Sequence, residues 1–184
     1  MTHLLTISGS LRAGSSNATL LAAAALVAPA SLTVSSYDAL AALPAFNPDI
    51  EEAATPVPAP VAHWRAALTG ADAILISSPE YAHGMPGALK NALDWVVGSG
   101  ELVGKPVGIL NASAASRFAH PQLIEVLTVM SATVVPAATV LVDTPRRGAD
   151  AAQIVADATV AATLRGALTA LVAACGNDPR SMGS

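Results

Sequence analysis

A short apolar run followed by a polar loop and a helix constrains the fold of this chain more than any other feature. Residues 73–76 read Ala-Ile-Leu-Ile, a continuous apolar run of the kind found in strands buried on both faces. Further on, Pro86 occupies the position of a first helical residue, and apolar residues recur at helical spacing from Leu89 to Val96. The polar residues between strand and helix therefore lie at the carboxyl end of a parallel strand, where open α/β sheets bind ligands.

Strand-like and helix-like segments alternate along the whole chain. The expected strands are His3–Ser8, Leu32–Ser36, Ala73–Ser77, Pro106–Leu110 and Thr133–Val135. The expected helices are Asn17–Ala28, His63–Leu68, Pro86–Val97, Pro121–Ser131 and Ala149–Ala174, the last with Gly176 as a stop, and the stretch from 37 to Pro60 reads as irregular. This alternation predicts an α/β fold, a doubly wound five-stranded parallel sheet of strand order 2-1-3-4-5 with helices on both faces.

Composition limits the class of protein. A chain of 184 residues suits a single domain over residues 1–184, and three prolines within 55–60 read as a loop rather than a linker. The net charge of −4 argues against a nucleic-acid surface, because phosphate neutralisation needs clustered Lys and Arg. One cysteine, Cys175, excludes a Cys-rich metal site, and no metal is expected. With no signal peptide and no apolar run near 20 residues, we expect a cytoplasmic protein without a membrane span.

The loop after the first strand has the composition of a phosphate site. Residues 8–17 read Ser-Gly-Ser-Leu-Arg-Ala-Gly-Ser-Ser-Asn and then open a helix. A helix amino terminus has unsatisfied N–H groups and a partial positive charge, so it attracts phosphate, and Arg12 would add a planar cationic clamp. The loop lacks both the Walker ending and the three-glycine dinucleotide fingerprint. A polar helix cap with a solvated arginine is the competing interpretation.

The second loop, residues 79–84, reads Pro-Glu-Tyr-Ala-His-Gly. Tyr81 offers a ring, His83 an imidazole, and Gly84 close approach of the backbone to a ligand. Glu80 could equally contact a ligand or hold the loop by local hydrogen bonds.

Together these loops resemble those of the NADPH-dependent FMN reductase family, which has the flavodoxin-like fold. The resemblance rests on three segments, Gly9-Ser10-Leu11-Arg12-x-x-Ser15-x-Asn17, Pro79-Glu80-Tyr81, and Pro86-Gly87-x-Leu89-Lys90-Asn91-Ala92-Leu93-Asp94-Trp95. It implies that Ser10, Arg12, Ser15, Ser16 and Asn17 bind the FMN phosphate. It further implies that Pro79, Glu80, Tyr81, Ala82, His83 and Gly84 lie beside the flavin ring. In the third loop the hydroxyls of Ser113 and Ser116 could donate to the flavin.

The resemblance also implies an activity. Family members reduce free flavin, quinones or related acceptors with NADPH or NADH through non-covalently bound FMN, in a ping-pong hydride transfer, and commonly form homodimers or homotetramers. No side chain is expected to act as catalytic acid or base, because the cofactor supplies the chemistry.

Two positions depart from the family pattern. Ala82 stands where the family usually has Asn, and the third loop, residues 111–120, has none of the glycines usual there. The glycine-free loop motivates an alternative function, a flavin-binding or flavin-lacking module that acts by association without turnover.

Overall fold

The structure, a computed structural model, describes residues 1–53, 56–113, 116–142 and 148–176. The elements along the chain are β1 (Thr2–Ser8), α1 (Ser16–Leu26), β2 (Leu32–Tyr37), the 3₁₀ helix η1 (Leu40–Ala42), α2 (Pro48–Glu52), α3 (Ala59–Thr69), β3 (Ala73–Ser77), α4 (Gly87–Asp94), β4 (Pro106–Asn111), α5 (Ala119–Val129), β5 (Thr133–Leu141), α6 (Ala151–Val155) and α7 (Ala158–Gly176).

The five strands form one parallel sheet in the order β2-β1-β3-β4-β5, which confirms the order predicted from the sequence. All five carboxyl ends therefore lie at the same edge of the sheet. The third strand has the predicted bounds and is buried along its whole length, as its apolar run indicated.

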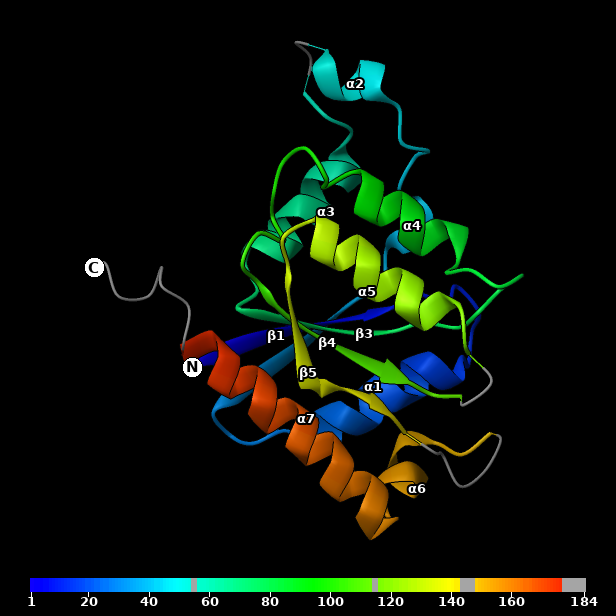
Figure 1. Cartoon of the computed structure of the whole chain (residues 1–184), viewed down its shortest axis with the longest axis vertical. Helices are drawn as coiled ribbons and strands as arrows, with labels where there is room; N and C mark the ends of the chain where they lie inside the picture. The colour runs from blue at the N-terminus through cyan, green and yellow to red at the C-terminus, as the bar shows by residue number, and fades with distance from the viewer. Residues whose placement is uncertain (54–55, 114–115, 143–147, 177–184) are drawn as a thin grey trace.

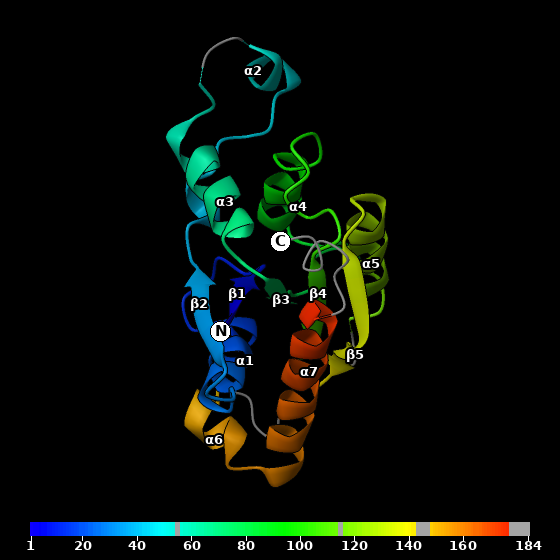
Figure 2. The same cartoon turned by 90° about the vertical axis from the view of Figure 1, so that its left-hand side faces the viewer.

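Helices cover both faces of the sheet, as predicted, and alternate residues of the strands enter two separate cores (Figure 2). Leu5, Ile7 and Ile76 pack under α3, α4 and α5. Leu4 and Leu75 pack on the other side under α1 and α7.

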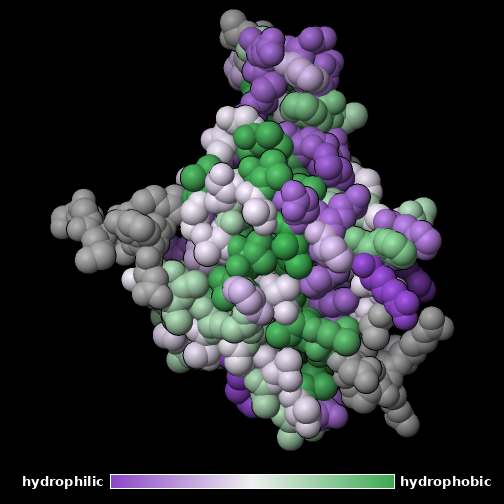
Figure 3. Space-filling view, in the orientation of Figure 1, coloured by the Kyte–Doolittle hydropathy of each residue, from purple (hydrophilic) through white to green (hydrophobic). Residues whose placement is uncertain are grey.

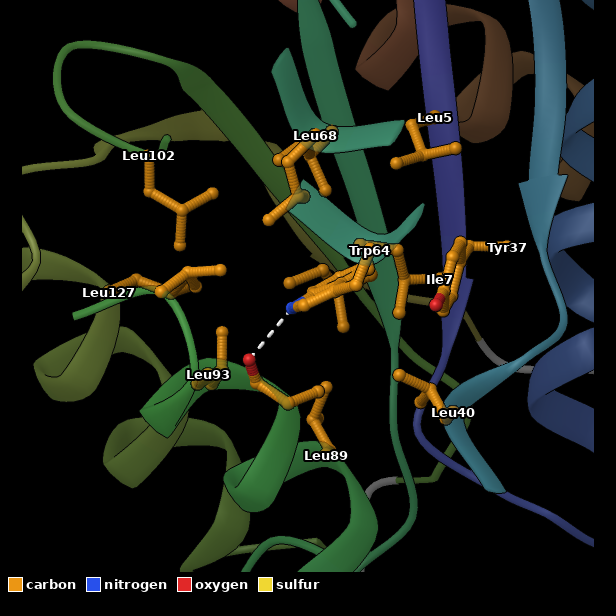
Figure 4. Packing of buried hydrophobic residues seen from close by; sticks show 14 of the residues in the cluster. Leu5, Ile7, Tyr37, Leu40, Trp64, Leu68, Leu89, Leu93, Leu102 and Leu127 are labelled. Atoms are coloured by element: carbon orange, nitrogen blue, oxygen red, sulfur yellow. Dashed lines mark hydrogen bonds between the residues drawn. The ribbon is translucent and has the colours of Figure 1, made fainter. Parts of the chain in front are cut away.

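The two tryptophans compensate for the scarcity of aromatic residues in the first of these cores. Trp64 and Trp95 are fully buried, and Trp64 Nε1 donates to the Ala92 carbonyl oxygen over 2.8 Å (Figure 4). This hydrogen bond joins α3 to α4 and satisfies the one polar atom of the indole ring.

The fifth strand is longer than predicted. It runs from Thr133 to Leu141, through Pro136 and beyond the predicted end at Val135. Because β5 is an edge strand, a proline without an N–H is tolerated there. The pairing with β4 shifts register between Val107 and Ile109, so the strand passes the proline through an irregularity and then pairs again.

The single helix predicted over Ala149–Ala174 is wrong: α6 ends at Val155 and α7 begins at Ala158. The cause is Asp157, whose Oδ1 accepts the backbone N–H groups of Thr159 at 2.8 Å and Val160 at 3.1 Å. A side chain that caps in this way starts a new helix instead of continuing the old one.

The stretch predicted as irregular up to Pro60 contains η1, α2 and the start of α3. The α2 segment projects from one end of the molecule, and its surface is mostly hydrophilic (Figures 1 and 3). Arg65 of α3 anchors it through a forked ion pair with Glu51, at 2.6 and 2.7 Å. Such long-range pairing has no local sequence signature.

By length and composition α7 could cross a membrane, with a mean hydropathy of 1.5 over its most apolar 18 residues. Leu164, Leu168 and Leu171 are nevertheless buried in the core beneath the sheet. The helix is therefore explained as one wall of that core.

Candidate functional site

A cavity of about 280 Å³ opens at the carboxyl edge of the sheet. Three loops line it, those that follow β1, β3 and β4. The lining residues are Ser16, Asn17, Ser78, Pro79, Glu80, Asn111, Ala112, Ser113 and Ser116. Most of them present hydroxyl, amide or carboxylate groups, so the cavity suits a polar ligand.

The first loop is held tightly at its start. A Cβ atom on Gly9 would lie 2.4 Å from Ser78 Oγ, so only glycine allows this approach between the loops after β1 and β3. Gly14 has a φ of +66°, and Ser15 then caps α1 by accepting the Asn17 N–H at 3.2 Å. The sequence predicted a helix start at Asn17, one residue beyond the observed start at Ser16.

The side chain of Asn17 is partly committed inside the protein. It is 6% exposed and lies 2.9 Å from the buried hydroxyl of Ser77 at the end of β3. Ser15 is equally buried and acts as the helix cap. Among the predicted phosphate-binding residues, Ser16 and Asn17 line the cavity.

Ser10 and Arg12 line a second cavity, of about 350 Å³, on the other side of the same loop. Tyr37 and Asp38 from the end of β2 and Leu40 of η1 are among its other walls. Arg12 is exposed, and no ion pair joins it to another described residue. The five residues predicted to hold a phosphate thus surround the start of α1 but do not face a single cavity.

The second loop forms a tight hairpin turn. Tyr81 and Gly84 exchange two backbone hydrogen bonds, at 2.9 and 3.0 Å, and Ala82 and His83 between them have φ values of 49° and 60°. Two central residues with positive φ define a type I′ turn. The left-handed backbone therefore falls on Ala82 and His83, two residues with side chains.

The predicted start of the following helix is off by one residue. Pro86 is the N-cap of α4, with extended backbone, and Gly87 is the first helical residue.

Glu80 caps α5, a role that the sequence left open. Its Oε2 accepts the backbone N–H groups of Phe118 at 2.7 Å and Ala119 at 2.9 Å. The hydrogen bond from Ala119 has the largest effect on the pKa of the Glu80 carboxyl, and the bond from Phe118 the next largest; both lower it. Pro79 and Glu80 line the cavity, whereas Tyr81, Ala82 and His83 are exposed on the turn beside it.

Two further contacts join the second loop to α5. The rings of His83 and Phe118 pack at a tilt of 31° with centroids 4.3 Å apart, and Met85 N donates to Gln122 Oε1 over 3.0 Å. Sequence reasoning did not single out Phe118 or Gln122, because neither belongs to a recognisable motif. Asn111 could have been found, since it is polar and ends an apolar strand at the ligand-binding edge.

The comparisons with known proteins agree with this geometry. The profile of the NADPH-dependent FMN reductase family matches residues 2–146. An NAD(P)H-dependent FMN reductase of Pseudomonas aeruginosa is 40% identical over 113 residues, and a quinone reductase of Escherichia coli is 36% identical over 113 residues. In both cases the alignment covers 60% of this chain and 60% of the length of the relative.

Solved structures resemble the chain over almost its full length. The flavoenzyme NAD(P)H:(acceptor) oxidoreductase of Paracoccus denitrificans superposes with a TM-score of 0.76 at 25% identity, covering 97% of this chain and 99% of that one. A flavodoxin, WrbA-like protein of Agrobacterium tumefaciens has a TM-score of 0.58 at 19% identity, covering 94% and 98%, and shares the fold.

Proposed function

The chain belongs to the NADPH-dependent FMN reductase family, and we propose that it is an NAD(P)H-dependent flavin or quinone oxidoreductase that binds FMN non-covalently. In this proposal residues 1–184 act as a single domain in the cytoplasm, as a homodimer or homotetramer. The acceptor is a quinone, free flavin or a similar small molecule. NADPH or NADH is the donor.

One observation supports the proposal above all others. The polar cavity at the carboxyl edge of the sheet is lined by the same three loops in which the sequence predicted flavin contacts. From the glycine-free third loop, Ser113 and Ser116 form part of its wall. A polar cavity at this edge favours the oxidoreductase over a flavin-lacking association module.

The residues at the start of α1 fit a phosphate dianion. Ser16 and Asn17 belong to the first turn of the helix, whose positive end attracts anions, and both line the cavity. Ser10 and Arg12 line the other cavity, so they would reach this phosphate only with their side chains turned around the loop, on which Arg12 is exposed. We assign the phosphate to the start of α1, with Arg12 as its charge-assisted contact from the exposed side of the loop.

The flavin ring would lie along the second and third loops. Pro79 and Glu80 form one wall of the cavity and Ser113 the other. The half-exposed rings of Tyr81 and Phe118 stand in the same loops and would limit access of water to one side of a flat ligand. When bound, FMN would accept a hydride from NAD(P)H and deliver the electrons to the acceptor in a separate, ping-pong step.

The test starts with FMN retention. The protein is incubated with FMN and desalted, and the visible spectrum of the protein fraction is recorded; we expect about one flavin per chain. Addition of NADPH or NADH under anaerobic conditions should then bleach the flavin, and a quinone should restore it. A flavin that stays oxidised with both donors would contradict the proposal.

Substitutions at two separate arginines, one in the first loop and one far from it, provide a matched comparison. Arg12→Ala should weaken FMN binding by roughly tenfold, because a charge-assisted contact to phosphate is lost. Arg165→Ala removes an exposed arginine on α7 and should leave FMN binding unchanged. Equal effects of the two variants would argue against a phosphate at the first loop.

A further inference from the structure

Glu80 joins two walls of the cavity that are far apart in the sequence. It belongs to the loop after β3, and the N–H groups that it accepts belong to Phe118 and Ala119 at the start of α5, 38 and 39 residues further on. Ser116 Oγ lies 3.5 Å from the same oxygen, Oε2. Glu80 and Ser116 both line the cavity, so their contact ties the loop after β3 to the loop after β4 at its wall.

We propose that Glu80 is a positioning residue, which sets the width and the charge of the FMN cavity by capping α5. The inference rests on the proposed function. It assigns Glu80 to the protein scaffold instead of to direct contact with the flavin.

Geometry is the first reason. A helix start leaves N–H groups without intrahelical partners, and at α5 no side chain of the helix's own N-cap residue, Phe118, satisfies them. Glu80 supplies the acceptor from the neighbouring loop. The start of α5 is therefore tied to the loop after β3 through Glu80, and the contacts His83–Phe118 and Met85–Gln122 join the same two segments.

Charge is the second reason. An uncompensated carboxylate beside a flavin would oppose the negative charge that reduction adds to the ring. At α5 the carboxylate faces the positive end of the helix and two N–H donors, which compensate its charge. Glu80 can thus line the cavity without repelling an electron-rich ligand.

The experiment compares Glu80→Ala and Glu80→Gln with Asp150→Ala. Gln keeps an oxygen acceptor of similar reach, whereas Ala removes it. Asp150 caps α6 by accepting the Gln153 N–H at 2.8 Å and does not line the cavity, so its variant loses a comparable cap elsewhere.

Two readouts are needed. Hydrogen exchange of the Phe118 and Ala119 amides in the ligand-free protein reports the cap, and quenching of flavin fluorescence reports the dissociation constant for FMN. We expect Glu80→Ala to speed exchange and to weaken FMN binding, each by roughly tenfold, and Glu80→Gln to restore both to within about threefold of wild type. Asp150→Ala should leave both unchanged.

Three results would overturn the proposal, and they are distinguishable. Unaltered FMN binding in Glu80→Ala with fast α5 exchange would make the cap purely structural. Weak FMN binding in Glu80→Gln with slow α5 exchange would mean that the carboxylate contacts the ligand directly. A wild-type protein that binds no FMN would overturn the proposed function, and the positioning role with it.

Discussion

The side chain of Asn17 in the first turn of α1 is hydrogen-bonded to the hydroxyl of Ser77 at the end of β3, with 2.9 Å between Asn17 Oδ1 and Ser77 Oγ. Both residues are buried, and the same hydroxyl lies 2.9 Å from the carbonyl oxygen of Leu110 in β4. Helix α1 and strands β3 and β4, which border the cavity, therefore meet at one buried hydroxyl. This contact fixes the helix start that the proposed phosphate site uses.

Removing that hydroxyl tests its structural importance. Ser77→Ala should lower the free energy of unfolding by about 1–3 kcal/mol, because the buried amide of Asn17 loses a partner and is desolvated without compensation. Urea denaturation measures the change. Ser31→Ala removes a hydroxyl from an exposed residue and should change stability by less than about 0.5 kcal/mol. Equal losses in the two variants would contradict the prediction.

Because Ala82 has a left-handed backbone, we expect its substitution by glycine to cost less stability than such a substitution usually does. At this φ of 49° a Cβ atom is strained, whereas in the exposed middle of α3 Ala62 is in its preferred conformation. Ala62→Gly should cost about 1 kcal/mol. Ala82→Gly raises the entropy of the unfolded chain by the same amount but relieves the strain, so the two variants should differ by about 1–2 kcal/mol in unfolding free energy. Identical costs would mean that the turn is unstrained.

Tyr37 has a hydroxyl that is buried without a hydrogen-bond partner among the described residues. Its ring packs against Trp64, with centroids 4.6 Å apart (Figure 4). Tyr37→Phe keeps that packing and removes the unsatisfied group, so we expect stability to rise by about 1 kcal/mol. A loss of stability in thermal or urea unfolding would reveal a partner for the hydroxyl in solution.

Burial also raises the pKa of Tyr37, which adds a pH test. Because the folded-state pKa exceeds the unfolded value of about 10, the unfolded chain loses its proton first as the pH rises. The contribution of Tyr37 to the free energy of unfolding is therefore complete below pH 10 and is lost as the pH rises above it. The stability advantage of Tyr37→Phe should widen in alkaline solution.

For Glu80 we expect the opposite pH dependence of stability. Its pKa is lowered in the folded state, chiefly by the hydrogen bonds from Ala119 and Phe118, so its contribution is present above the unfolded value of about 4.3 and is lost as the pH falls further. The difference in melting temperature between wild type and Glu80→Gln should therefore shrink between pH 5 and pH 3. An equal difference at pH 5 and at pH 3 would contradict the prediction.

The strands and their order were predictable because their signals are local. A buried parallel strand needs a continuous apolar run, and Ala73–Ser77 has one whose ends the structure reproduces. The prediction failed where a distant element decides the outcome. The fifth strand was predicted to end at Val135, but it continues through Pro136 because the edge position of β5 tolerates a proline.

The loops that line the cavity were predictable in the same way, since each follows a strand. Their division between two cavities was not, because Arg12 and Ser16 are four residues apart yet line opposite sides of one loop. The role of Glu80 was left open for a similar reason. Its partners are nearly 40 residues away, and nothing in the sequence around Phe118 or Ala119 indicates that their N–H groups donate to Glu80.

The sequence by itself determined the sheet, the edge at which a ligand binds and the three loops that reach it. Those features depend on periodicity, on chain direction and on caps formed within one helical turn. Only the tertiary structure decided which side chains face the cavity and which hold its walls together. Glu80 with Ala119 and Asn17 with Ser77 meet across 39 and 60 residues, and such pairs form because the packing of helices on the sheet brings them within hydrogen-bond distance.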